Sequence, residues 1–432
     1  MEPRPSSFLY GKEMVGKVTA TTATVQLVAG DLCESSAKFR LYYDTISRTD
    51  PVDYANQTDE LNGFSQDDPI VFSLPRLSPN TRYYYRLGYD TGDGWTYRDE
   101  YHFHTQRPPG ETFRFSIVTD LHILPIDLTD GNREIVLQNI LGSGGDILIS
   151  LGDDYALAYQ QEDPYFWKNR DVLVEYWGRL RAIWDIACHS MSYIPVNGNH
   201  EGLWGWTTST PQYAYILEGK HRYLPVPDGG TFPEGGDADG RYGAFTWGDA
   251  LFIWLDVTGF CEFDPFLVGD NSLYILGDAQ RNFLETTLAN SSATWKFIFA
   301  HHPFGGDDGW ERGYGRGNAN DAFQYDQATV QALMEQYGAQ AFFYGHDHVF
   351  SISLANGVSY ICSGKGGSIC NWIHRALEHY NPFEIFVNGI PSLAPSGHVQ
   401  VDVSPTAATV SFIKASKDME NGSVLATHVI SP

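Results

Sequence analysis

Seven side chains that can bind a metal ion follow short apolar segments of the chain. They are carboxylates, imidazoles and one amide, without a thiolate: Asp120, His122, Asp153, Asn199, His301, His346 and His348. Oxygen donors and imidazole nitrogens suit Zn, Mn, Fe or Mg better than copper(I). Seven donors exceed the needs of one tetrahedral ion, and with one bridging carboxylate they fit two ions about 3.5–4 Å apart. The residue types therefore indicate a two-metal site.

Each donor stands where an apolar, strand-like segment stops. The segments are residues 113–122, 146–155, 193–201, 294–303 and 341–348. Ligands collect at the carboxyl ends of strands in open α/β sheets, which would bring these five ends together. Side-chain alternation along a strand also predicts that Asp120 and His122 point to the same side. Asn-Gly and Gly-Asn pairs also form ordinary turns, but five coincidences at five strand ends weigh against that interpretation.

The segments between these strands have the spacing of helices or the composition of loops. Aromatic and aliphatic residues recur at helical spacing over 164–188, and residues 278–288 and 328–337 also have a helical pattern. Residues 204–249 are rich in Gly, Pro and Tyr, and we predict long loops there. Further strands are predicted at 250–256, 358–362, 397–403 and 408–413.

The first hundred residues have the pattern of an all-β region. Short β-branched and aromatic segments alternate with turn signals, which predicts a β-sandwich. The L-x-P-x-T-x-Y-x-Y phrase at 77–85 resembles the fibronectin type III signature, in which a tyrosine stabilises the corner before a late strand. His102 and His104 share one strand face, a metal-binding spacing, but the neighbouring sequence offers them no acidic or thiol cluster. Residues 107–110 (Arg-Pro-Pro-Gly) break the pattern as a linker, so we predict domains at 1–108 and 109–432.

Composition limits the partners and the compartment. The formal net charge of −25 argues against nucleic acids and anionic membranes as partners. No run of about 20 apolar residues occurs, so no transmembrane helix is expected. The N-terminal residues lack the apolar segment of a signal peptide, and the five cysteines are scattered without a CxxC pair. Two compartments stay open: secreted or periplasmic if a signal peptide was removed, and cytoplasmic otherwise.

The strand-end motifs together resemble a known superfamily. Asp-x-His, Gly-Asp, Gly-Asn-His-Glu, the Ile298-x-x-His301 motif and Gly-His-x-His, in this order, are similar to those of the calcineurin-like metallophosphoesterases over residues 113–415. The N-terminal region, with the aromatic strand 83–85 and Gly94-Trp95, resembles that of purple acid phosphatases, as does Gln280-x-x-Phe283-Leu284-Glu285. The resemblance implies an N-terminal fibronectin type III-like sandwich and an α/β catalytic domain with a β-sandwich core flanked by helices.

Two positions depart from the purple acid phosphatase pattern. Those enzymes usually have Asp-x-Gly where this chain has Asp120-Leu121-His122, and they have an iron-binding tyrosine where this chain has Ala156. Tyr155 is adjacent, but a shift of one residue would aim its side chain differently. We therefore expect a similar architecture with a histidine-type metal site, and no purple colour.

The resemblance also implies roles for single residues. The first metal would take Asp120, His122, Asp153 and His348, and the second Asp153, Asn199, His301 and His346, so that Asp153 bridges them. The spacing favours His301 over His302 as the ligand, leaving His302 to support the ligands or to face the substrate. His200 is expected to act as general acid or as a donor to the transition state. Glu201 would orient His200 or cap a helix, and Asp154 would lie behind the site or face solvent. Arg312 and Arg316, in a rim loop, either bind phosphate or are ordinary surface charges.

These roles predict a phosphoester hydrolase with two divalent or mixed-valence ions, of which Fe, Zn and Mn are the expected metals. A metal-activated hydroxide would attack phosphorus in line with the leaving oxygen. The substrate would be a small phosphate ester, with no nucleic acid or membrane as partner. A phosphomonoesterase is the simplest interpretation, and a phosphodiesterase of the same superfamily is the alternative. From another class, a degenerate binding or adhesion protein stays open, and the oligomeric state is undetermined.

Overall fold

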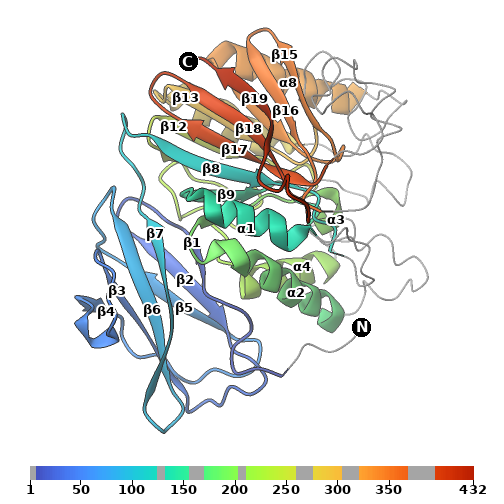
Figure 1. The fold of residues 1–432 in the computed structure, drawn as a ribbon. Helices are drawn as coiled ribbons and strands as arrows, with labels where there is room; N and C mark the ends of the chain where they lie inside the picture. The colour runs from blue at the N-terminus through green and yellow to red at the C-terminus, as the bar shows by residue number, and fades with distance from the viewer. Residues whose placement is uncertain are drawn as a thin grey trace.

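The computed structural model describes residues 6–123, 132–154, 170–202, 211–258, 276–303, 321–367 and 395–432, which form four β-sheets with helices beside two of them (Figure 1). The sheets divide between an N-terminal region (residues 6–104) and a C-terminal region (residues 113–432). Within the described ranges, no helix has both the length and the apolarity needed to cross a bilayer.

The N-terminal region contains two antiparallel sheets. One has β1 (Met14–Gly16), β2 (Ala23–Val28) and β5 (Pro69–Leu74); the other has β4 (Asn56–Gln57), β3 (Lys38–Asp44), β6 (Arg82–Asp90) and β7 (Trp95–His104). Buried side chains of both sheets share one hydrophobic core, and a single 3-10 turn (Pro51–Asp53) accompanies them, in agreement with the all-β prediction. The Ser78 backbone N–H donates to the Tyr83 hydroxyl over 2.8 Å, a contact that fits the predicted tyrosine corner. The fibronectin type III class itself stays a prediction.

The C-terminal region contains two six-stranded mixed sheets. The first has the order β10 (Ser192–Pro195), β9 (Ile147–Ser150), β8 (Phe113–Val118), β17 (Gly397–Val403), β18 (Ala408–Lys414) and β19 (Val424–Ile430). The second has the order β11 (Gly243–Trp247), β12 (Ala250–Trp254), β13 (Trp295–Phe299), β14 (Ala341–Tyr344), β16 (Val358–Ser363) and β15 (Phe350–Ala355). Strands β8 to β10 run parallel to one another, as do β12, β13, β14 and β16.

Alternation along these strands divides their side chains between two cores. The Phe115 ring of the first sheet lies 5.0–6.1 Å from four phenylalanine rings of the second sheet, so the inner faces of the sheets pack together. Phe297 and Phe299 belong to this shared core, whereas Ile298 between them packs in a second core that contains Leu284. A strand buried on both faces has no position along its length where a polar side chain reaches water.

Helices cover the outer faces of both sheets (Figure 1). Helices α1 (Arg133–Ser143), α2 (Arg170–Cys188) and α4 (Pro211–Tyr223) share a core with β8 to β10, and α6 (Gly277–Asn290) and α8 (Asp321–Tyr337) share one with the second sheet. The mixed α/β prediction for this region is confirmed. The predicted helix at 164–188 corresponds to α2, and its first six residues lie outside the described ranges.

The prediction of long loops at 204–249 is wrong for part of that segment, because α4 and β11 (Gly243–Trp247) lie within it. Pro211 stands at the first position of α4, where a missing N–H costs nothing. Gly219 lies on the helix because α4 approaches α2 closely: a Cβ there would be 2.0 Å from the Trp177 ring. Here Pro211 begins the helix and Gly219 lets it pack closely against α2, although the Gly- and Pro-rich composition alone indicated a loop.

The two regions contact each other directly. The Tyr85 hydroxyl donates to the His189 carbonyl over 2.7 Å, and the buried Arg181 guanidinium donates to the carbonyls of Lys12, Gln26 and Tyr223. The segment predicted as a linker is attached to the C-terminal region, since Arg107 pairs with Asp146. The boundary at 108/109 stays a prediction, but the chain there is anchored.

Candidate metal centre

The predicted donors follow the carboxyl ends of strands from both sheets of the C-terminal region. β8, β9 and β10 end at Val118, Ser150 and Pro195 in the first sheet, and β13 and β14 end at Phe299 and Tyr344 in the second. The donors come two to four residues later. They lie where the edges of the two packed sheets meet.

One group of donors consists of Asp120, His122 and His348. Asp120 Oδ1 lies 3.0 Å from His348 Nε2 and 3.4 Å from His122 Nε2, and the two imidazole nitrogens are 3.0 Å apart. All three side chains are buried. These three residues are among the four predicted for the first ion, and the fourth is Asp153.

A second group surrounds His301. Its Nε2 lies 3.1 Å from Asp153 Oδ2, 3.1 Å from Asn199 Oδ1 and 3.3 Å from His346 Nδ1, and Asn199 Oδ1 is 3.0 Å from His346 Nδ1. The other nitrogen of His301 lies 2.9 Å from the Leu151 carbonyl, which holds the ring in place. These are the four residues predicted for the second ion.

Asp153 lies between the two groups. Its Oδ2 is 3.1 Å from His301 Nε2 and 3.8 Å from His122 Nε2, so one carboxylate oxygen faces both sets. The charges of His301 and His200 hold the pKa of Asp153 below its usual range, although burial acts to raise it. This placement is the one that a bridging carboxylate requires.

The donor spacing fits bound divalent ions. An ion with ligands at about 2.1 Å places neighbouring donor atoms about 3.0 Å apart in octahedral and about 3.4 Å apart in tetrahedral geometry. The observed separations of 3.0–3.4 Å within each group match these values. A carboxylate oxygen and two imidazole nitrogens, each able to bind a cation through a lone pair, converge in a buried space at Asp120, His122 and His348.

The backbone of five donors has a left-handed conformation. Asp120, His122, Asp153, His346 and His348 all have φ between 44° and 70°. Asp120 and His122 therefore come together through tight turns in the loop after β8. The prediction that strand alternation places them on the same side is wrong, because both residues lie beyond the end of the strand. Non-glycine residues in this conformation are strained and cluster at functional sites.

Two glycines allow the loops after β9 and β10 to touch. A Cβ on Gly152 would lie 2.2 Å from the Gly198 nitrogen, and a Cβ on Gly198 would lie 2.3 Å from Asp153 Oδ1. Both contacts are shorter than any side chain tolerates. The Gly-Asp and Gly-Asn motifs thus provide the close approach of two backbones that brings Asp153 next to Asn199.

Glu201 joins the same two loops. Its carboxylate accepts the backbone N–H groups of Asp153 (2.8 Å), Asp154 (2.8 Å) and Gly198 (2.6 Å). The Gly198 bond is that of a helix cap on α3 (Asn199–Gly202), as one of the two predicted roles requires. The other two bonds were not predicted, and through them Glu201 connects the loop after β10 to the loop after β9. Burial raises its pKa to about 7.

The two histidines predicted to support catalysis lie on different sides of the donors. The His200 backbone N–H donates to Asp153 Oδ1 (2.8 Å), and His200 Nε2 is 3.7 Å from Asp153 Oδ2, so its ring adjoins both His122 and Asp153. Burial lowers the pKa of His200 to about 4. His302 is fully buried, with its ring 4.8 Å from that of His346, a position suited to supporting that residue.

The remaining candidates do not join the donor groups. Asp154 is buried and accepts the Ser150 hydroxyl (2.7 Å), so the solvent-facing alternative is wrong. His102 and His104 lie on β7 in the N-terminal region, and His104 Nδ1 is 2.7 Å from the Thr105 carbonyl. Four positions lie outside the described residues: Tyr155, Ala156, Arg312 and Arg316.

Sequence reasoning missed three residues behind Asn199, two of them buried and the third half-buried. Lys220, Asn197 and Asp256 form a hydrogen-bonded series that approaches the Gly198–Asn199 corner. Asp256 had a usable signal, since it ends the apolar segment 250–256 as the donors end theirs. Lys220 had none, because a lysine on a helix normally indicates a solvent-exposed face.

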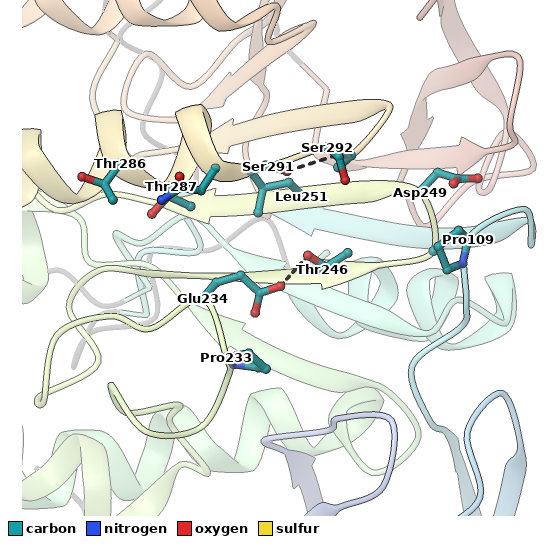
Figure 2. A pocket seen from close by; sticks show the side chains of 13 residues that line it. Pro109, Pro233, Glu234, Thr246, Asp249, Leu251, Thr286, Thr287, Ser291 and Ser292 are labelled. Carbon is teal, nitrogen blue, oxygen red and sulfur yellow. Dashed lines mark hydrogen bonds between the residues drawn. The ribbon is translucent and has the colours of Figure 1, made fainter.

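A separate hollow of about 580 Å³ lies at the opposite end of the second sheet (Figure 2). It is lined by residues before β12 and after α6, among them Asp249, Ser291 and Ser292, together with Glu234 and Thr246. The parallel strands β12 and β13 begin at this end and lead away from it toward the donors. None of the candidate ligands lines it.

Comparisons with known proteins address the C-terminal region. A family model described as calcineurin-like phosphoesterase matches residues 113–350. No curated protein matches the chain. Similar solved structures include the Plasmodium inner membrane complex anchor GAP50 (16% identity, 74% of this chain and 89% of that chain, TM-score 0.45). A putative 5'-nucleotidase from Staphylococcus aureus is also similar (16% identity, 74% of this chain and 54% of that chain, TM-score 0.38). So is the phosphopantetheinyl hydrolase of Mycobacterium tuberculosis (17% identity, 60% of this chain and 91% of that chain, TM-score 0.33).

Proposed function

The chain belongs to the calcineurin-like phosphoesterase family, and on that premise we propose that it hydrolyses small phosphate esters with two metal ions, most simply as a phosphomonoesterase. One observation carries the proposal: seven donors from five strand ends converge, and Asp153 faces both the group of Asp120, His122 and His348 and the group around His301. A chain that had lost the activity would be free to lose these donors, and all seven are present.

In this proposal each residue has a separate task. Asp120, His122 and His348 hold one ion, and Asn199, His301 and His346 hold the other, with Asp153 shared. Bound divalent ions supply Lewis-acid stabilisation of a phosphoryl group and lower the pKa of water. Asp153 and Glu201 keep the loops after β9 and β10 in register. His200, beside Asp153 and His122, directs a hydrogen bond to the phosphoryl oxygens as charge develops on them.

We further propose that the architecture is that of purple acid phosphatases, with a fibronectin type III-like sandwich at 1–108. The supports are the shared core of two antiparallel sheets and the Ser78–Tyr83 contact. The partner is a small phosphate ester, since the net charge of −25 disfavours a polyanionic nucleic acid.

Metal reconstitution tests the function. Metal-free protein is loaded with Fe, Zn or Mn, its metal content is measured, and turnover of p-nitrophenyl phosphate and of bis(p-nitrophenyl) phosphate is compared. We expect two ions per chain and monoester turnover that chelation abolishes and metal restores. Activity that survives chelation contradicts the mechanism, and faster diester turnover replaces the monoesterase with a diesterase. A folded protein that binds no ion would instead be a binding or adhesion protein.

A further inference from the structure

A buried lysine lies behind the loop that carries Asn199 and His200. Lys220, in the last turn of α4, is 1% exposed, and its Nζ donates to Oδ1 of Asn197 over 2.7 Å. Burial lowers the pKa of Lys220, and the negative charge of Asp256 opposes that shift. Burying an ammonium group is costly unless the group is paired and hydrogen-bonded. The hydrogen bond from Lys220 offsets this cost only if the Asn197 side chain is itself held in place.

Asn197 binds a second charged group through the opposite end of its amide. Its Nδ2 donates to Oδ2 of Asp256 over 3.0 Å. An ammonium only donates hydrogen bonds and an ionised carboxylate only accepts them. The amide satisfies both neighbours only with its oxygen toward Lys220 and its nitrogen toward Asp256. The ammonium–amide–carboxylate series thus fixes the side chain two residues before Asn199.

Asp256 is held firmly at the far end of the series. It follows β12, is 1% exposed, and its Oδ1 accepts the N–H and the hydroxyl of Thr258 over 2.7 and 2.6 Å. The Gln280 side chain on α6 accepts the Asp256 N–H and donates to its carbonyl, both over 2.7 Å. Asn197 follows β10 of the first sheet, so the series connects the layers of the two sheets behind the metal centre.

We propose that Lys220, Asn197 and Asp256, of which the two charged residues are buried, form a positioning network that sets where Asn199 and His200 lie, and this inference rests on the proposed function. Asn197 is followed by Gly198 and Asn199, and Asn199 Oδ1 is within 3.1 Å of His301 Nε2 and 3.0 Å of His346 Nδ1. A change in the Asn197 side chain moves the backbone that carries this donor. The group of Asp120, His122 and His348 is attached to other loops, so the network acts selectively on the group that contains Asn199.

Helix docking alone does not account for the charges. Apolar side chains of similar volume usually hold a helix as well as a buried ion pair does, or better. A fixed amide orientation, by contrast, requires a donor on one side and an acceptor on the other. The network therefore serves the geometry of the corner that follows Asn197, at a cost in stability.

An exchange of the amide and the carboxylate tests the network. Asn197→Asp alone puts two carboxylates at the 3.0 Å contact with Asp256, whereas the double variant Asn197→Asp/Asp256→Asn restores an acceptor toward Lys220 and a donor–acceptor pair beyond it. In metal-free protein, the amides of residues 193–201 should exchange hydrogen about tenfold faster or more in the single variant. The double variant should recover most of the protection, as a coupled pair does in a double-mutant cycle.

Metal binding supplies the second readout. Titration of metal-free protein with Zn should show one of two sites weakened about 10–100-fold in Asn197→Asp and the other unchanged. Arg181→Met is the matched control, because Arg181 is also a fully buried cation on a helix, but it donates to carbonyls of the N-terminal region and to the carbonyl at the end of α4, and not to Asn197 or Asp256. It should lower Tm without changing exchange at 193–201 or either Zn affinity.

The outcomes separate the two proposals. Wild-type exchange and Zn affinities in Asn197→Asp overturn the network, as does equal weakening of both sites or a double variant no better than the single one. Hydrogen exchange needs neither metal nor substrate. A protein that shows the expected exchange pattern but hydrolyses no phosphate ester therefore retains the network and refutes the proposed function.

Discussion

The N-terminal and C-terminal regions bury their strands differently, and the difference decides what a polar residue means in each. In β5 the buried residues Ile70, Phe72 and Leu74 alternate with exposed ones, and Val71 is 42% exposed. In β9 and β14 every residue is buried. A strand with one face in water accepts polar residues along its length, whereas a strand covered on both faces confines them to its ends. Polar strand ends are therefore informative about chemistry only in the C-terminal region.

Buried aspartates in the two regions give the largest expected contrast. Asp153→Asn removes the carboxylate that faces both donor groups, so turnover should fall by more than the ~10–100-fold typical of groups that only support a metal ligand. Asp44→Asn is the counterpart in β3, where the carboxylate accepts Thr45 N–H and the Arg48 guanidinium. It should lower stability and leave turnover per folded molecule unchanged. Similar turnover losses in both variants would break the comparison.

Core truncations test the burial difference itself. Phe115→Ala opens a cavity between two packed sheets and should lower the free energy of unfolding by about 3–5 kcal/mol. Val71→Ala, on the open face of β5, should change it by no more than about 0.5 kcal/mol. Urea denaturation of both variants measures the two values. A small effect at Phe115 would mean that the two sheets do not pack as the structure shows.

Two glutamates that each accept three hydrogen bonds sharpen the comparison further. Glu201→Gln puts an amide nitrogen among the N–H donors that tie the loops after β9 and β10, so turnover should fall about 10–100-fold. Glu100 accepts from Ser47 Oγ, Arg48 N–H and the Tyr54 hydroxyl in the N-terminal region. Glu100→Gln should cost stability alone. Equal kcat/KM for Glu201→Gln and wild type would remove Glu201 from the site.

The sequence was sufficient to predict the strands that precede the candidate donors, and the structure brings those side chains together, whereas their role as metal ligands stays a prediction. Those strands are mostly apolar, and the candidate donors follow two to four residues after each strand ends. The edge strands β11, β15 and β19 were missed, because β19 and β15 carry exposed residues and β11 lies in a segment of loop-like composition. Periodicity indicates an edge strand less clearly than a strand covered on both faces.

What the sequence could not predict depends on contacts between distant segments. The left-handed φ of Asp120 and His122 arises from loop closure after β8, and no local pattern indicates it. Lys220 is 23 residues from Asn197 along the chain, and its burial depends on where α4 packs. The candidate donors can be predicted from their residue type and their position in the sequence. The groups that orient them can be identified only once the packing of distant segments is known.

A histidine inside the first sheet provides the smallest test, through pH. His398 on β17 is fully buried, and burial lowers its pKa to about 3, against about 6.5 in the unfolded chain. Between these values the unfolded state binds the additional proton, so the free energy of unfolding is highest above about pH 6.5 and decreases as the pH falls below that value. Linkage gives a loss of up to about 2 kcal/mol between pH 7 and pH 5, which His398→Leu should remove from the pH dependence measured by denaturation.

His104 on β7 is only partly buried, and its ring has the Thr105 carbonyl beside it, so His104→Gln should change the same dependence much less. If both substitutions flatten the curve equally, burial on two faces is not what distinguishes the C-terminal strands.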